Sequence, residues 1–183
     1  SGKRKLSEFL DQTDDTSFEV LDPDRVRSHR ATYRETTGGD PPEMARPSKE
    51  QLSALSKRLS MGQAPFVDFA LWGPFGARAA KLLKFEAQVF VGGELVTRRL
   101  QGPETFDSWR AGWQVFRAAM IMLKAAGPAA LDNYEEGLRQ LMTLHPEHWG
   151  VIFVADEAMR SERWERLAEE FADDGLVNPS DLY

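Results

Sequence analysis

Residues 106–124 read FDSWRAGWQVFRAAMIMLK, and large apolar side chains recur in this stretch at alternating steps of three and four residues. These side chains are Phe106, Trp109, Trp113, Phe116, Met120 and Leu123. An α-helix turns once in about 3.6 residues, so this spacing places all of them on one face. The stretch therefore predicts a long amphipathic helix that lies against the hydrophobic core.

Two more helices are predicted after this one. Gly127 ends the first helix and Pro128 opens the next. The apolar face of that helix comprises Leu131, Tyr134, Leu138 and Leu141. Pro146 is expected to open the last helix, whose apolar side comprises Trp149, Ile152, Phe153, Asp156 and Met159, followed by Trp164. Residues 151–154 also suit a buried strand, but the helical period continues past them and favours a helix. Short connections predict three near-antiparallel helices.

The first half of the chain has a different organisation. We expect a flexible arm at residues 1–21, a helix and a Pro/Gly linker at 22–47, a globular core at 48–175 and a tail at 176–183. Asp22-Pro23 is typical of a helix start, and Ser48 with Gln51 forms a capping box. Residues 66–72 predict an extended buried segment, and residues 76–83 a short helix.

A hairpin is predicted in the centre, because two runs of β-type residues at 85–91 and 94–100 flank Gly92-Gly93. The resulting fold class is α+β and predominantly α-helical, with N-terminal helices, a central β-hairpin and a C-terminal three-helix core.

Composition limits the functions that remain. The 183 residues contain no cysteine, which excludes disulfides and thiolate chemistry, and the net charge is −6. No stretch approaches the about 20 apolar residues of a membrane span. We therefore expect an intracellular protein, cytoplasmic or nuclear, with no membrane partner and no cofactor.

One region is basic although the chain as a whole has a negative net charge. Between residues 78 and 99 there are five bases and two acids, and the bases are Arg78, Lys81, Lys84, Arg98 and Arg99. On an edge strand beside aromatic side chains, such bases suit contacts with RNA or DNA phosphates. The alternative is that these charges merely protect an exposed strand edge from aggregation.

Two further groups of side chains were considered for chemistry. His145 and His148 flank a predicted helix start, which is a poor arrangement for zinc because helical zinc sites place two histidines four residues apart. Asp156 falls on an apolar helix face and needs a partner such as Arg160, Arg163 or a backbone amide, so a structural ion pair is favoured over catalysis. Trp72, Trp109, Trp113, Trp149 and Trp164 are candidate core or interface anchors.

Several segments resemble a known family. They are PFVDFALWGPFG at 65–76, LQGP at 100–103, AAMIMLK at 118–124, and Ala155-Asp156 leading to Arg160. The order and content of these segments resemble the capsid-type, gag-like region of mobile-element polyproteins in unicellular algal genomes. The resemblance implies a structural role in assembly or nucleic-acid packaging, with other parts of a parent polyprotein as partners, and implies no catalytic residues.

The sequence thus favours a non-enzymatic structural domain that acts by self-association or by binding a partner. One alternative is an RNA- or DNA-binding adaptor that uses the basic hairpin. A second alternative is a metal-dependent enzyme centred on His145 and His148.

Overall fold

A computed structural model describes residues 19–75 and 82–170, with residues 164–170 described as backbone alone. These residues form an α+β fold that is predominantly helical, as predicted. The elements in chain order are α1 (Pro23–Thr37), the 3-10 turn η2 (Glu43–Ala45), α2 (Lys49–Ser60), β1 (Lys84–Val91), β2 (Glu94–Gln101), α3 (Phe106–Met122), α4 (Pro128–Leu144) and α5 (Trp149–Glu170).

Helix α3 lies at the centre of the core. Thr105 caps its first turn. Of the predicted stripe, Trp109, Trp113, Phe116 and Met120 are fully buried, and Phe106 and Leu123 at its two ends are partly buried. Much of the remaining surface of α3 is buried as well, because α1, η2, α2 and α4 all pack against this helix. A helix surrounded in this way is apolar over most of its surface and organises the fold.

The two N-terminal helices begin at their predicted signals. Asp22 accepts a bond from the Arg25 amide at 2.9 Å, and α1 ends at Gly38 with a φ of +85°. Ser48 and Gln51 exchange the two bonds of a capping box at 2.9 and 3.1 Å. The expected linker contains η2, which packs against α3, so this stretch is held in contact with the core helix.

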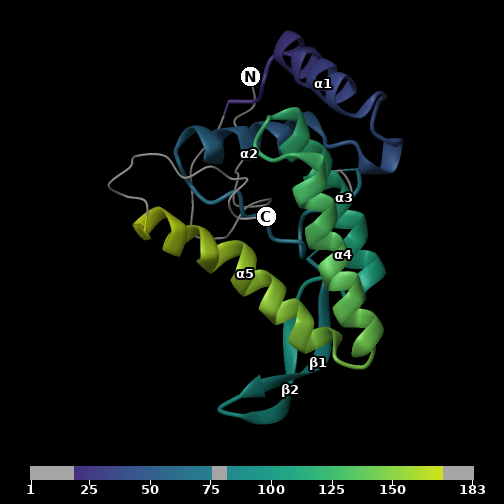
Figure 1. Cartoon of the computed structure of the whole chain (residues 1–183), viewed down its shortest axis with the longest axis vertical. Helices are drawn as coiled ribbons and strands as arrows, with labels where there is room; N and C mark the ends of the chain where they lie inside the picture. The colour runs from purple at the N-terminus through teal and green to yellow at the C-terminus, as the bar shows by residue number, and fades with distance from the viewer. Residues whose placement is uncertain (1–18, 76–81, 171–183) are drawn as a thin grey trace.

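The predicted hairpin is present. Strands β1 and β2 pair antiparallel, with Phe85 opposite Leu100 and Val91 opposite Glu94. Gly92 and Gly93 form the turn with φ values of +59° and +87°, a left-handed conformation that glycine adopts without a steric penalty. The hairpin extends below the helical body in Figure 1.

The last helix differs from the prediction in two details. It begins at Trp149 rather than at Pro146, because Pro146 and Glu147 form a turn and the first helical bond runs from the Ile152 amide to the His148 carbonyl at 3.1 Å. Met159 was expected on the apolar side, but it is 42% exposed, and Arg160 is buried instead. The strand alternative for residues 151–154 is wrong, since they lie within α5.

Helix α5 lies unusually close to β1. A Cβ atom at Gly150 would come within 2.4 Å of the Ala87 Cβ and 2.9 Å of the Gln88 carbonyl oxygen. Glycine therefore permits a contact that any side chain would block. As a result, α5 crosses from the hairpin obliquely toward the side of the molecule, while α3 and α4 run side by side (Figure 1).

The segment at residues 66–72 is buried but has no regular strand structure. Val67, Phe69 and Trp72 are buried, and a turn occupies residues 69–71. Gly112 of α3 lets the segment approach, because a Cβ there would lie 2.8 Å from the Trp72 carbonyl oxygen. Of the short helix expected at 76–83, residues 76–81 lie outside the described residues, and Leu82 and Leu83 are not helical.

Candidate functional site

The tryptophans are core side chains wherever the structure describes them. The buried ones are Trp72, Trp109, Trp113 and Trp149, and the side chain of Trp164 lies outside the described part. Trp109 and Trp113 stack with ring centroids 5.1 Å apart, and Tyr134 stacks on Trp113 at the same distance. These aromatic side chains stabilise the contact between α3 and α4 and are not accessible to a partner.

Asp156 and Arg160, which lie one helical turn apart on α5, form a buried ion pair. Arg160 Nη2 lies 2.9 Å from Asp156 Oδ2, and Arg160 Nε bonds both carboxylate oxygens at 3.0 and 3.1 Å. The two side chains are 1% and 0% exposed, respectively. This is the ion pair that the position of Asp156 on an apolar face required.

The side chains of Asp156 and Arg160 also form hydrogen bonds with other parts of the core. Trp109 Nε1 donates to Asp156 Oδ2 at 2.9 Å, and the Tyr134 hydroxyl donates to Oδ1 at 2.8 Å. Arg160 Nη1 donates to the Val67 carbonyl at 3.0 Å, and the guanidinium carbon lies 4.2 Å from the centroid of the Phe69 ring. The centre therefore connects α3, α4, α5 and the 66–72 segment, and its carboxylate is occupied by donors on both oxygens.

Arg163, the other predicted partner of Asp156, has a different position. Its side chain is exposed on α5. Within the part of the chain that the structure describes, the side chains bonded to Asp156 are those of Trp109, Tyr134 and Arg160. This arrangement favours a structural role for Asp156, because a buried carboxylate with both oxygens bonded has no free position for a substrate.

Surface ion pairs connect α3 to α4. Arg117 binds Asp132 through two bonds of 2.6 and 3.0 Å, and Arg110 binds Glu135 at 2.5 Å. Burial lowers the pKa of Arg117, but the hydrogen bond and charge of Asp132, with Tyr33 adding to them, raise the pKa overall. The hydrogen bond that Arg110 donates to Glu135, followed by the charge of that carboxylate, raises the pKa of Arg110. Acids and bases balance along this surface, so it has little residual charge for a ligand.

Glu136 of α4 takes part in a further exposed pair. Hydrogen bonds from Arg139 and then from Gln140 lower the pKa of its carboxyl group. This pair lies within one helix and does not create a site.

The basic residues of the hairpin do not share one surface. Successive residues of a strand point to opposite faces, and directly paired residues share a face. Arg98 lies opposite Ala87, on the face that packs toward α5, whereas Arg99 and Lys84 lie on the outer face. Arg99 lies directly across from Glu86, so the net charge of this position on the outer face is close to zero. Arg78 and Lys81 lie outside the described residues.

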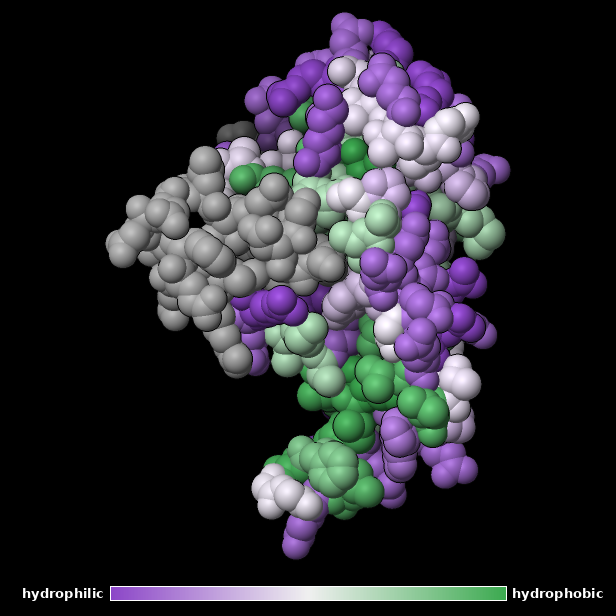
Figure 2. Space-filling view, in the orientation of Figure 1, coloured by the Kyte–Doolittle hydropathy of each residue, from purple (hydrophilic) through white to green (hydrophobic). Residues whose placement is uncertain are grey.

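The end of the hairpin is apolar and exposed. Phe90 lies opposite Leu95 on the outer face, and the two are 61% and 45% exposed. Val91, the next residue of β1, lies on the opposite face and is 47% exposed. Figure 2 shows hydrophobic surface gathered at the hairpin end and on the adjoining body. The end of α4 contributes exposed Leu141 and Leu144 to the apolar surface of the molecule.

His145 and His148 lie on the α4–α5 turn and are both exposed, with ring centroids 6.3 Å apart. Among the described residues, no group of three or more His, Asp or Glu side chains is arranged to hold a metal ion. The described helices also include none long and apolar enough to cross a membrane.

A basic pocket is the feature that the sequence analysis missed. It measures about 530 Å³ and lies between α1, η2, the start of α2 and Phe75. Its charged lining residues are Arg27, Arg30, Arg46, Lys49 and Glu43. The arginine-rich sequence of α1 offered a signal, but α1 and Arg46 are distant enough in sequence that only the fold brings them together.

No family model, curated protein or solved structure matches the chain.

Proposed function

We propose that this chain is a non-enzymatic assembly module that self-associates through the outer face of its hairpin end. The observation that carries this proposal is the exposed cross-strand pair of Phe90 and Leu95. Contiguous exposed apolar residues with polar neighbours are typical of protein interaction sites.

The hairpin is anchored at its base and unsupported at its end. At the base, Phe85 packs against Phe153 of α5 with ring centroids 5.7 Å apart, and Val89 is buried. Beyond Val89 the strands extend past the body (Figure 1). Two strands alone are marginally stable in water, so covering the end with a partner stabilises it.

A second copy of the chain is the partner that the charges favour. A symmetric dimer brings the same patch of both copies together, so the patch must be neutral or carry both signs. The outer face meets this condition, because the Phe90–Leu95 pair is followed by Gln88 opposite Thr97 and by Glu86 opposite Arg99. A nucleic acid would instead require bases gathered on one face, and the register separates Arg98 from Arg99.

This role agrees with the capsid-type region of mobile-element polyproteins that the sequence resembles. We place the chain in such a polyprotein as part of the same proposal. Assembly by repeated contacts between copies needs an exposed self-complementary surface and no reaction centre.

Light scattering coupled to size-exclusion chromatography tests the proposal over a concentration series. We expect the mass of the wild-type chain to rise with concentration, and to rise further in high salt, because apolar contacts strengthen when salting-out anions are present. Phe90→Thr with Leu95→Thr should keep the chain monomeric. Each buried side chain contributes about 1.5–3 kcal/mol, and each occurs twice in a symmetric dimer.

Met44→Thr is the matched control, since Met44 is 60% exposed but lies on η2, away from the hairpin. The control should associate like the wild type. A wild-type chain that stays monomeric throughout, or a hairpin variant that associates as strongly as the control, contradicts the proposal.

A further inference from the structure

We infer that the pocket between α1, η2 and α2 binds a nucleotide, with arginines on its phosphate and Phe75 against its base. The site is separate from the hairpin end, and nothing in the argument for self-association requires it. The features that indicate a nucleotide site are unpaired cations, their position around one pocket, and an exposed aromatic ring.

The pocket has an excess of positive charge. Among the residues that the structure describes, the pocket is lined by four cationic side chains, Arg27, Arg30, Arg46 and Lys49, and by one carboxylate, that of Glu43. This excess is notable in a chain whose net charge is −6. Cations that gather against the overall charge of a protein create a local field that attracts anions.

The arginines of the pocket differ in whether they are paired. Arg27 forms an ion pair with Asp24 of its own helix. For Arg30 and Arg46, the described residues provide no carboxylate within ion-pair distance, and Glu43 bonds neither of them. Both side chains are half-buried, so water screens their mutual repulsion incompletely. An anion placed between them removes this repulsion.

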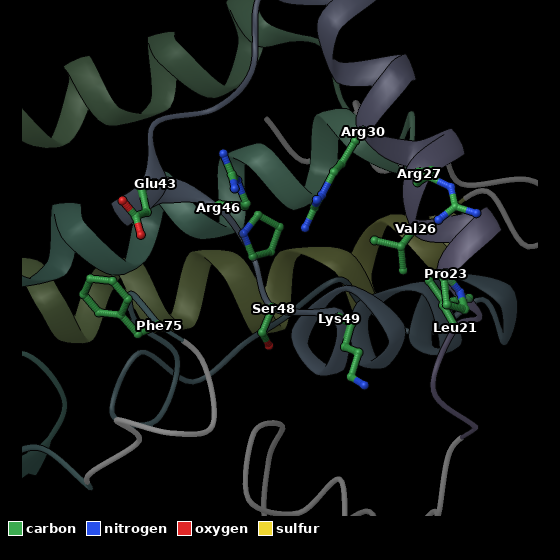
Figure 3. Close-up of a pocket in the computed structure, with 11 residues that line it drawn as sticks. Leu21, Pro23, Val26, Arg27, Arg30, Glu43, Arg46, Ser48, Lys49 and Phe75 are labelled. Carbon is green, nitrogen blue, oxygen red and sulfur yellow. The ribbon is translucent and has the colours of Figure 1, made fainter. Parts of the chain in front are cut away.

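Both arginines line the same pocket. In Figure 3, Arg30 reaches from α1 toward the side on which Arg46 lies, whereas Arg27 points away along α1. Guanidinium groups present paired donors that match phosphate oxygens, and two of them can bind one phosphate group from two sides. Lys49 lies at the start of α2 on the same pocket and adds charge.

Phe75 supplies the second element of the site. Its side chain is 54% exposed, and its backbone φ of +65° is a conformation that bulky residues rarely adopt. Strain of this kind is retained where it places a side chain for use. An exposed ring on the border of a basic pocket offers a surface on which a nucleobase stacks.

The pocket also has a suitable size. Its volume of about 530 Å³ lies within the usual range of small-molecule sites. The first turn of α2 already has its Gln51 amide bonded to Ser48, so the phosphate ligands are mainly side chains. A free nucleotide and one nucleotide of a single strand present the same chemistry to these residues.

Titration calorimetry of the full chain at low salt separates the parts of this inference, with pyrophosphate, ADP and a single-stranded dT hexamer as probes. We expect ADP to bind more tightly than pyrophosphate, because the base adds stacking on Phe75. Arg46→Gln should weaken both by about tenfold, since a charge-assisted bidentate contact is lost. Phe75→Gly should reduce ADP affinity to that of pyrophosphate while it relieves the strained backbone.

Arg25→Gln is the matched control, because Arg25 is exposed on α1 and does not line the pocket. Like Arg46→Gln it removes one arginine charge, but from outside the pocket, and it should change the affinity by less than about twofold. A hexamer that binds more tightly than ADP identifies a nucleic-acid strand as the source of the nucleotide, and the reverse identifies a free nucleotide.

Three results overturn the inference. One is the absence of binding by all three probes at low salt. Another is an equal loss of affinity in Arg25→Gln and Arg46→Gln, which would indicate diffuse attraction rather than a pocket. The third is an ADP affinity that Phe75→Gly leaves unchanged. Melting temperatures of the variants verify that each remains folded.

Discussion

Arginine has two contrasting environments in this molecule. Arg160 is fully buried, bonds Asp156 and the Val67 carbonyl, and lies over the Phe69 ring. Arg30 and Arg46 are half-buried at the pocket between α1 and α2. Among the described residues, no carboxylate lies within ion-pair distance of either. The same side chain thus fixes the packing of helices in one region and presents free donors in the other.

The difference follows from the solvent that each site retains. A charge without water must have every donor bonded, because desolvation costs several kcal/mol per ion when it is uncompensated. A charge that keeps part of its hydration tolerates an empty partner position. Burial therefore converts an arginine into a structural group, and partial exposure leaves it available for a ligand.

The largest effect should come from breaking the buried pair. Asp156→Ala leaves the Arg160 guanidinium buried without its counter-charge and removes the acceptor of Trp109 and Tyr134. We expect the free energy of unfolding to fall by about 3–5 kcal/mol, measured by urea denaturation followed by tryptophan fluorescence.

Glu136→Ala is the control for that measurement, because it removes an acid whose pair with Arg139 is exposed. Its unfolding midpoint should stay close to that of the wild type. Equal midpoints for Asp156→Ala and the wild type would mean that the buried pair does not hold the helices together.

A smaller effect is expected where α5 is seated on β1. The added Cβ of Gly150→Ala would meet Ala87 and the Gln88 carbonyl, which moves the helix that carries Asp156 and Arg160. Overpacking of this kind costs about 1–3 kcal/mol of unfolding free energy. The readout is the thermal midpoint by circular dichroism.

Gly137→Ala provides a comparison within α4, because nothing lies within 4 Å of the Cβ that it adds. There alanine should stabilise the helix by about 0.5–1 kcal/mol. If both substitutions shift the midpoint in the same direction, close approach is not the reason for glycine at position 150.

The smallest effect on folding should come from the pocket. Arg46→Gln removes a charge that has no described partner, so the free energy of unfolding should change by no more than about 0.5 kcal/mol in the absence of ligand. Urea denaturation measures it beside Asp156→Ala. A loss as large as that of the buried pair would show that Arg46 is structural and would remove the contrast between the two regions.

Local signals in the sequence predicted much of the fold. The helix start at Asp22-Pro23, the capping box of Ser48 and Gln51, and the Gly92-Gly93 turn all act within a few residues. The period of the apolar residues in α3 was equally clear, because burial follows the helical repeat. The start of α5 was misplaced, since Pro146 suits a turn as well as a first helical turn.

The candidate sites were harder to predict for the opposite reason. The bonds from Arg160 to Val67 and from Trp109 to Asp156 join residues 93 and 47 positions apart. The hairpin was predicted, but its strand register, which separates Arg98 from Arg99, was not. The pocket forms only where α1, η2 and the start of α2 come together, and no short-range sequence pattern predicts that arrangement.

The sequence by itself determined the identity of the helices, the position of the hairpin and the need of Asp156 for a cationic partner. These follow from backbone geometry, capping and the cost of burying a carboxylate, which are properties of neighbouring residues. The tertiary structure alone decided which arginine loses its water, how closely Gly150 lets α5 approach β1, and which cations converge. Those outcomes depend on how elements pack, because desolvation and convergence arise only where distant segments meet.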